Sequence, residues 1–219
     1  LQALDHLPAF PAVRALVGPD LGAILRKEPG SKAPGRDGWS YLDLKALPND
    51  ALALLAEIFG LVEDLGVWPA DIAHSFVAML PKGGTGEADD YRPIVLLSVY
   101  YRLWAKARAA PFKEFLRSAG IAPVGPQPSA ETLAYDLAMR LALSQSGGED
   151  TSGLALDWSK CYDHLVLDLL RQFGERIHMP ASISGPMLAA YAQPRSVLLN
   201  GSVAAERIPS AGLAPGCPR

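Results

Sequence analysis

The sequence predicts an α+β fold, because stretches with helical periodicity alternate with short strand-like runs along the 219-residue chain. Apolar residues recur at helical spacing in 51–65 and again in 100–118. Two apolar runs joined by a Gly-rich loop lie within 76–98, and Asn200-Gly201 joins two more. Asn-Gly between apolar runs is a strong signal of a β-hairpin. We therefore expect helices packed with a sheet that contains β-hairpins.

The N-terminal part of the chain is expected to be mainly helical. Residues 1–31 contain short helical pieces interrupted by prolines and glycines, and the turn Lys32–Gly38 (KAPGRDG) follows them. Its composition alone is typical of a linker, and the alternative is a sequence motif with a structural role. A long helix is predicted to start at Pro48–Asp50 and to end at Gly66, a residue type that often terminates helices.

A cationic hairpin is predicted next. Phe76–Leu80 indicates a strand, a polar Gly-rich loop follows, and a second apolar run starts at Tyr91. Lys82 then stands at the end of one strand and Arg92 at the start of the other. Such a pair can hold a triphosphate, which carries about four negative charges, from two sides. The alternative is a solvated surface hairpin.

Residues 100–118 are expected to form an amphipathic helix, which Pro111 would cut or kink. Basic residues are predicted to lie outside its apolar side: Arg102, Lys106, Arg108 and Lys113. They either follow a nucleic-acid backbone or form a solvated face. The surrounding segment 82–117 carries seven basic and four acidic residues, whereas the whole chain has a net charge of −3. This distribution permits a local phosphate-binding surface without requiring one.

A candidate metal ligand lies at the end of the short apolar strand 154–156. Asp157 follows this strand directly, and Asp163 is expected to cap a helix that begins there. A carboxylate at a strand end, beside a turn into a helix, can hold a divalent cation against substrate phosphates. The structural alternative for Asp157 is a cap or an ion-pair partner.

Composition excludes some classes of protein. Hydrophobic residues make up 49% of the chain and charged residues 20%, as in globular proteins, and no apolar run approaches the roughly 18 residues of a membrane span. Cys161 and Cys217 form no disulfide framework or zinc pattern, so we expect reduced thiols and an intracellular location, in nucleus or cytoplasm. The chain starts at Leu1 without methionine or signal segment, and we expect a fragment of a longer protein.

Four ordered motifs together resemble reverse transcriptases of non-LTR retrotransposons. They are KAPGRDG from Lys32, LPK and YRPIVLLS between Leu80 and Ser98, LALDWSKCYDHL from Leu154, and GLAPGCPR from Gly212. The third matches the family's motif A: an apolar strand, then Asp, aromatic, Ser, Lys, small residue, aromatic and Asp. The chain departs from the family pattern at Arg36, where proline is usual, and at Pro215, where glutamine is usual.

The resemblance implies roles for particular residues. Asp157 would be catalytic and would bind Mg²⁺, or Mn²⁺, together with the backbone carbonyl of Trp158. Tyr162 would lie under the sugar and select deoxynucleotides by crowding out a 2′-hydroxyl. The residues implied to bind the incoming nucleotide are Lys82, Arg92, Ser159, Lys160, Cys161 and Tyr162. Those implied to contact template and primer are Pro93, Gly212 and Gly216.

The resemblance also implies a domain organisation and an activity. A helical N-terminal extension, 1–31, would precede a fingers region, 32–128, and a partial palm, 129–219, that stops before the family's Tyr-x-Asp-Asp hairpin. The activity would be RNA-directed DNA polymerisation by two-metal nucleotidyl transfer, with RNA template, DNA primer and deoxynucleoside triphosphates as partners. The alternative is a non-catalytic nucleic-acid-binding remnant of a degenerate or domesticated retroelement, which Pro215 and the acidic balance favour.

Overall fold

The computed structural model describes residues 7–8, 10–83, 87, 90–120, 130–148 and 164–214. Within them lie seven helices and a four-stranded mixed sheet, in agreement with the α+β class. The helices are α1 (Gly18–Lys27), α2 (Tyr41–Lys45), α3 (Asn49–Leu65), α4 (Val99–Ser118), α5 (Ala130–Ser146), α6 (Leu167–Arg176) and α7 (Ala181–Ala192). The strands are β1 (Ser75–Pro81), β2 (Tyr91–Leu96), β3 (Arg195–Leu199) and β4 (Ser202–Val203).

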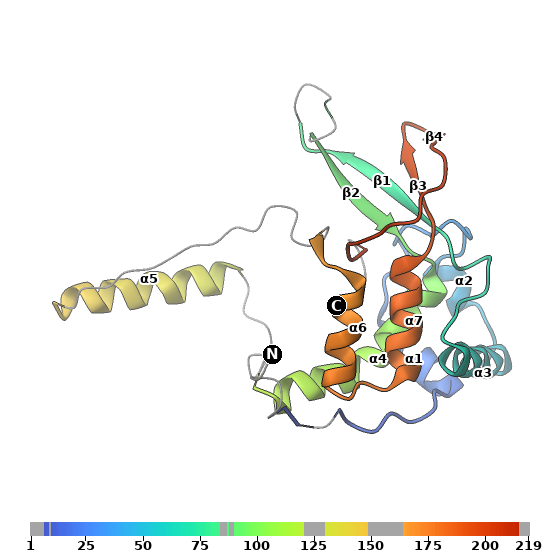
Figure 1. Ribbon diagram of the computed structural model, residues 1–219, viewed down its shortest axis with the longest axis horizontal. Helices are drawn as coiled ribbons and strands as arrows, with labels where there is room; N and C mark the ends of the chain where they lie inside the picture. Colours follow the sequence, from blue (N-terminus) through green and yellow to red (C-terminus); the bar gives the residue numbers. More distant parts are fainter. Residues whose placement is uncertain are drawn as a thin grey trace.

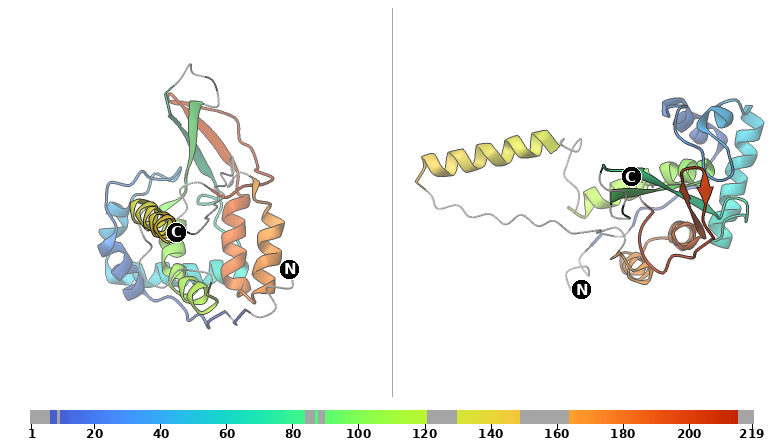
Figure 2. Two further views of the ribbon diagram at one scale, coloured as in Figure 1. Left: turned by 90° about the vertical axis from the view of Figure 1, so that its left-hand side faces the viewer. Right: turned by 90° about the horizontal axis from the view of Figure 1, so that it is seen from above.

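The sheet extends from one end of a group of packed helices. Figure 1 shows the β1–β2 and β3–β4 hairpins above α3, α4, α6 and α7. α5 lies apart from these elements in Figure 1 and in the right-hand view of Figure 2. Large apolar side chains of α5 are accordingly exposed, among them Tyr135 at 69% and Leu143 at 64%.

β1 is an inner strand that joins parts of the chain far apart in sequence. The strand order is β2-β1-β3-β4. Phe76 of β1 lies opposite Leu96 in antiparallel β2 and opposite Ser196 in parallel β3. β3 continues into β4 through Asn200 and Gly201, whose φ angles are 49° and 79°. Positive φ at both central residues is typical of a type I′ turn, so the predicted Asn-Gly hairpin is confirmed.

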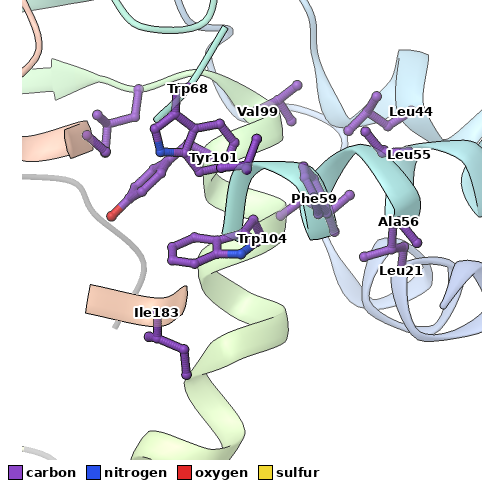
Figure 3. Packing of buried hydrophobic residues seen from close by; sticks show 14 of the residues in the cluster. Leu21, Leu44, Leu55, Ala56, Phe59, Trp68, Val99, Tyr101, Trp104 and Ile183 are labelled. Atoms are coloured by element: carbon purple, nitrogen blue, oxygen red, sulfur yellow. The ribbon is translucent and has the colours of Figure 1, made fainter. Parts of the chain in front are cut away.

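An aromatic cluster forms the centre of the core. The Trp68 ring lies 5.6 Å from the rings of Tyr101 and Trp104 and 6.2 Å from that of Phe59, all edge to face. The Trp68 indole N–H donates to the carbonyl oxygen of Pro186 at 2.9 Å. Edge-to-face aromatic pairs stabilise beyond the area they bury. The cluster therefore connects α3, α4 and α7 to the segment that precedes β1 (Figure 3).

The predicted limits of two helices are confirmed, and the predicted cut of one helix at Pro111 is wrong. Pro48 is the N-cap of α3, and Gly66 ends it with a left-handed φ of 70°. α4 begins one residue before the predicted Tyr100, after Ser98, whose Oγ accepts from the N–H of Tyr100 at 3.2 Å. Pro111 lies inside α4 without ending it.

α6 starts later than predicted. Asp163 lies outside the described residues, but the N-cap of α6 is Val166, so the prediction of a helix beginning at Asp163 is wrong. In a helix from Asp163 the carbonyl of Leu165 would accept a helical hydrogen bond. Instead it accepts from the N–H of Gly212 at 2.8 Å, a partner remote in sequence.

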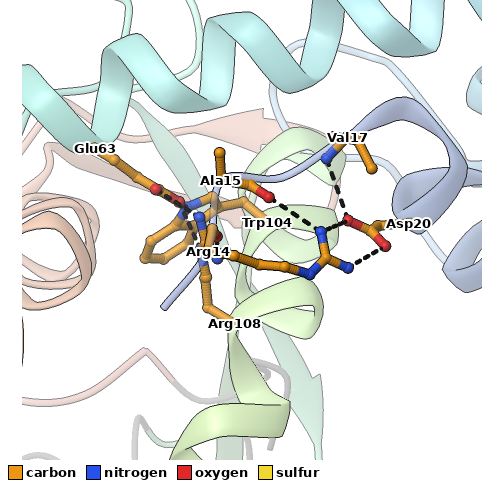
Figure 4. A network of polar contacts seen from close by, with 7 residues as sticks. All are labelled: Arg14, Ala15, Val17, Asp20, Glu63, Trp104 and Arg108. Atoms are coloured by element: carbon orange, nitrogen blue, oxygen red, sulfur yellow. Dashed lines mark hydrogen bonds and ion pairs between the residues drawn. The ribbon is translucent and has the colours of Figure 1, made fainter. Parts of the chain in front are cut away.

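Glu63 of α3 and Arg108 of α4 form a buried bidentate ion pair. Nε and a terminal nitrogen of Arg108 donate to the two carboxylate oxygens at 2.7 and 2.6 Å. The Arg108 and Glu63 side chains are only 6% and 10% exposed. Glu63 also accepts from the indole N–H of Trp104, and Arg108 donates to the carbonyl of Arg14 (Figure 4). The pair therefore ties α3, α4 and the N-terminal segment together.

The substitution Arg108→Ala is expected to lower the free energy of unfolding by about 3–5 kcal/mol, because it leaves the Glu63 carboxylate buried and unpaired. Urea denaturation of the 219-residue chain measures this. The matched control is Arg14→Ala, which removes an ion pair with Asp20 whose arginine is 69% exposed. That change is expected to cost less than about 1 kcal/mol. Equal losses in the two variants would contradict the structural importance of the buried pair.

Candidate nucleotide-binding site

The β1–β2 hairpin places Lys82 and Arg92 on one face of the sheet. Leu80 lies opposite Arg92 in the antiparallel register. The N–H of Lys82 donates to the carbonyl of Asp90 at 2.7 Å, which continues the same register beyond the end of β1. Because side chains alternate along a strand, Leu80, Lys82 and Arg92 share a face. The two cations are diagonal neighbours at the loop end of the hairpin.

Both cationic residues are exposed to solvent. In the described part of the chain, the Arg92 side chain has no ion-pair or hydrogen-bond partner. Pro93 is also exposed, and it lies opposite Met79, on the sheet face away from Arg92. The predicted hairpin is confirmed, while the roles of these residues with nucleotide and template stay predictions.

His74 connects three segments at the base of the hairpin. Arg36, from the KAPGRDG motif, donates to Nδ1 of His74 at 2.7 Å. Arginine can only donate, so Nδ1 accepts, and Nε2 carries the proton that is shared with Oγ of Ser196 at 3.1 Å. Glu206 lies 3.2 Å from Nδ1. His74 is only 7% exposed, so these bonds fix the start of β1 against the motif and β3.

The KAPGRDG turn packs against the start of α4. A Cβ added at Gly35 would lie 2.8 Å from backbone atoms of Ser98, closer than real Cβ contacts come. Arg102 of α4 donates to the carbonyl of Ala33 at 2.9 Å, and its guanidinium lies 5.2 Å from the ring centroid of Tyr41. This motif is therefore held by both close packing and hydrogen bonds, and Lys32–Gly38 is more than a linker.

Basic residues of α4 are bound within the fold. Lys106 pairs with Glu28 at 2.5 Å, and Lys32 pairs with the same carboxylate at 2.8 Å. Burial alone would raise the pKa of Glu28, but the hydrogen bonds from Lys106 and Lys32 outweigh burial and lower it. Arg108 pairs with Glu63. Arg108 is therefore not part of a solvated face, while contact of Lys106 with nucleic acid stays a prediction.

The prediction that Arg108 lies outside the apolar side of its helix is wrong. Arg108 belongs to the buried row of α4 with Tyr101, Trp104 and Phe115. These residues recur at helical spacing, and this periodicity is the signal in the sequence that places Arg108 on the buried side of the helix. The sequence favours an exposed position for Arg108, because arginine is almost never fully buried unless it is paired and the partner is remote in sequence.

The Gly212 segment lies beside the residues that follow motif A. Gly212 has a φ of 95°, which glycine adopts without steric cost. Its N–H donates to the carbonyl of Leu165 at 2.8 Å. Ala214, two residues further, is 3% exposed and packs in the core. The first residue of the fourth motif is therefore hydrogen-bonded to the last residue of the third.

The other predicted site residues lie outside the described residues, and their roles stay predictions. They are Asp157, Trp158, Ser159, Lys160, Cys161, Tyr162 and Gly216. Across the described ranges, no three His, Cys, Asp or Glu side chains gather in a way that could hold a metal ion. Every helix in those ranges is too short or too polar to cross a bilayer.

Three curated proteins of Drosophila melanogaster are similar to this chain. It is 25% identical over 201 residues, 88% of its length, to the probable RNA-directed DNA polymerase from transposon BS. It is 37% identical over 76 residues to the RNA-directed DNA polymerase from mobile element jockey, and 26% identical over 106 residues to the probable RNA-directed DNA polymerase from transposon X-element. These matches cover 34% and 48% of the chain.

These relatives are polymerases of non-LTR retrotransposons, so the resemblance found in the four motifs is confirmed. The chain is similar to a fragment of such a reverse transcriptase. It spans 22%, 8% and 12% of the lengths of the BS, jockey and X-element proteins. No protein-family model matches the chain.

The stability of the fold is expected to fall as the pH decreases below about 6.5, the ordinary pKa of histidine. Burial lowers the pKa of His74, the charge of Arg36 lowers it further, and Glu206 opposes them. The unfolded state therefore binds more protons than the folded state between the folded pKa and the ordinary value, so in this window the free energy of unfolding falls as the pH is lowered. Above the window His74 contributes no pH dependence.

Urea unfolding between pH 7 and pH 5 measures this slope, and the variant His74→Gln should reduce it. The carboxylates of Asp20 and Glu28, whose pKa values are lowered, affect stability at more acidic pH and do not interfere. An identical slope in wild type and His74→Gln would show that the histidine contributes nothing to the pH dependence.

Proposed function

We propose that this chain is the nucleotide-binding part of an RNA-directed DNA polymerase from a non-LTR retrotransposon. Its fingers would lie in 32–128 and the start of its palm in 129–219. The observation that carries the proposal is the common face of Lys82 and Arg92 at the loop end of the hairpin. Two exposed cations, one in β2 and one just beyond the end of β1, would offset part of the charge of a triphosphate, and arginine can bind two phosphate oxygens at once. The relatives, which are named as RNA-directed DNA polymerases, support the same chemistry.

Asp157 would supply a carboxylate to Mg²⁺ or Mn²⁺, and the carbonyl of Trp158 would supply a second oxygen. Hard divalent cations prefer oxygen ligands, so the donor types fit. Paired metal ions stabilise the attacking and leaving oxygens in nucleotidyl transfer. The neighbouring residues would complete the nucleotide site: Ser159, Lys160, Cys161 and Tyr162. Tyr162 would favour deoxynucleotides by excluding a 2′-hydroxyl.

Pro93, Gly212 and Gly216 would lie against the template and primer. The hydrogen bond between Gly212 and Leu165 supports this assignment, because it brings the Gly212 segment beside the chain that leaves motif A. The partners would be an RNA template, a DNA primer and deoxynucleoside triphosphates.

A non-catalytic nucleic-acid-binding remnant is the second candidate function. Pro215 replaces a glutamine of the family and removes its side-chain amide. Triphosphate binding that depends on Arg92 would favour the polymerase over this candidate.

Arg92→Gln is expected to weaken deoxynucleoside triphosphate binding about tenfold or more, because a hydrogen bond to a charged group contributes about 1.5–3 kcal/mol. Fluorescence titration of the 219-residue chain with a labelled deoxynucleoside triphosphate and Mg²⁺ measures this. Arg117→Gln, which removes an exposed arginine near the end of α4, is the matched control and should leave affinity unchanged. Equal affinities of the wild type and Arg92→Gln would remove the main support for the proposal.

The 219-residue chain alone is expected to extend no primer. Two metal ions need several carboxylates, and Asp157 is the one carboxylate that the motifs assign in this chain. Primer extension on an RNA template with Mg²⁺ measures the activity, with Asp157→Asn in parallel to detect a contaminating polymerase. Incorporation that is lost in Asp157→Asn would show that the expectation of an inactive fragment is wrong.

A further inference from the structure

α3 carries a second apolar face that is largely exposed in the described part of the chain. Its buried side consists of Leu52, Leu55, Ala56, Phe59 and Val62. Four more aliphatic residues form an exposed row, called here the outer stripe: Leu54, Ile58, Leu61 and Leu65. Their exposed fractions are 58%, 38%, 59% and 70%. A helix that is apolar on both sides is normally buried on both.

The spacing of the outer stripe is that of a helix–helix contact. Its members are separated by four, three and four residues. This alternation places them along one line of the helix, as at the a and d positions of a coiled coil. Single exposed leucines are common on protein surfaces, but an aligned row of four marks an interaction site.

An acidic row runs along one side of the outer stripe. Asp50, Glu57 and Asp64 are exposed and recur every seven residues, so they occupy one flanking position of the same repeat. Within the described part of the chain, Glu57 and Asp64 have no ion-pair partner. α3 contains no lysine or arginine.

Asp64 adds an independent argument from the helix itself. It lies in the last turn of α3, where the helix dipole disfavours a negative charge and no basic residue compensates. A cation supplied by a partner would relieve this cost. Two copies of the chain packed antiparallel through the outer stripe would instead place their acidic rows against each other, which like charges oppose.

We propose that the outer stripe of α3 binds an amphipathic helix that has basic residues beside its apolar row. Apolar side chains of the partner would cover Leu54, Ile58, Leu61 and Leu65. Its lysines or arginines would pair with Glu57 and Asp64. The site is separate from the β1–β2 hairpin and does not depend on nucleotide binding.

The test uses two labelled synthetic peptides of the same length and the 219-residue chain. Both peptides have leucines at alternating spacings of three and four, and one has lysines where the other has glutamates. Fluorescence anisotropy should show at least tenfold tighter binding of the lysine peptide, with an affinity that decreases as salt increases. The double variant Leu54→Gln/Leu61→Gln should weaken binding at least tenfold, and Glu57→Lys/Asp64→Lys should reverse the preference for the two peptides.

The matched control is Leu137→Gln/Leu143→Gln in α5, where the leucines are 59% and 64% exposed. It should leave the affinity for the lysine peptide unchanged, and circular dichroism confirms that each variant is folded. Equal binding of the two peptides, or a loss of affinity in the α5 control, overturns the proposal. Self-association of the chain that disappears in Leu54→Gln/Leu61→Gln also overturns it, because a second copy would then occupy the stripe.

Discussion

Trp68 holds the helices and the sheet in a fixed relation. Its ring packs on aromatic residues of α3 and α4, and its N–H binds the carbonyl of Pro186 in α7. The chain enters β1 at Ser75, shortly after Trp68, and β3 starts shortly after α7 ends. Both inner strands of the sheet therefore start from elements that this one side chain joins. The placement of Lys82 and Arg92 depends on packing at the opposite end of β1.

The distribution of charge follows from how the helices pack. The basic segment 82–117 owes much of its positive charge to α4, where Lys106 and Arg108 are paired with Glu28 and Glu63. These carboxylates belong to segments that carry the acidic excess of the chain. Some of the charges that make one stretch of the sequence basic and another acidic are thus paired with each other inside the fold. The exposed positive charge of this segment lies on the hairpin, at Lys82 and Arg92, and near the end of α4, at Lys113 and Arg117.

Features set by residues close in sequence could be predicted, and those set by distant contacts could not. α3 and the Asn200-Gly201 turn follow from local spacing and turn chemistry. The parallel pairing of β1 with β3 and the start of α6 depend on partners far along the chain, such as Gly212 for Leu165. In the candidate site, the shared face of Lys82 and Arg92 follows from strand alternation. His74 belongs to no sequence motif, and its role is visible only from its three partners in the fold. The catalytic role of Asp157 stays a prediction.

The order of the described strands leaves β2 and β4 as the two edges of the sheet. β4 has two residues, and β2 contains Pro93, which has no N–H to donate, next to the exposed charge of Arg92. Short strands, prolines and charges at an edge prevent a sheet from recruiting strands of other molecules. The Arg92-Pro93 dipeptide therefore makes the β2 edge a poor template for edge-to-edge pairing with another molecule. The same two positions would then serve both the resistance of this edge to pairing and the proposed contacts with nucleotide and template.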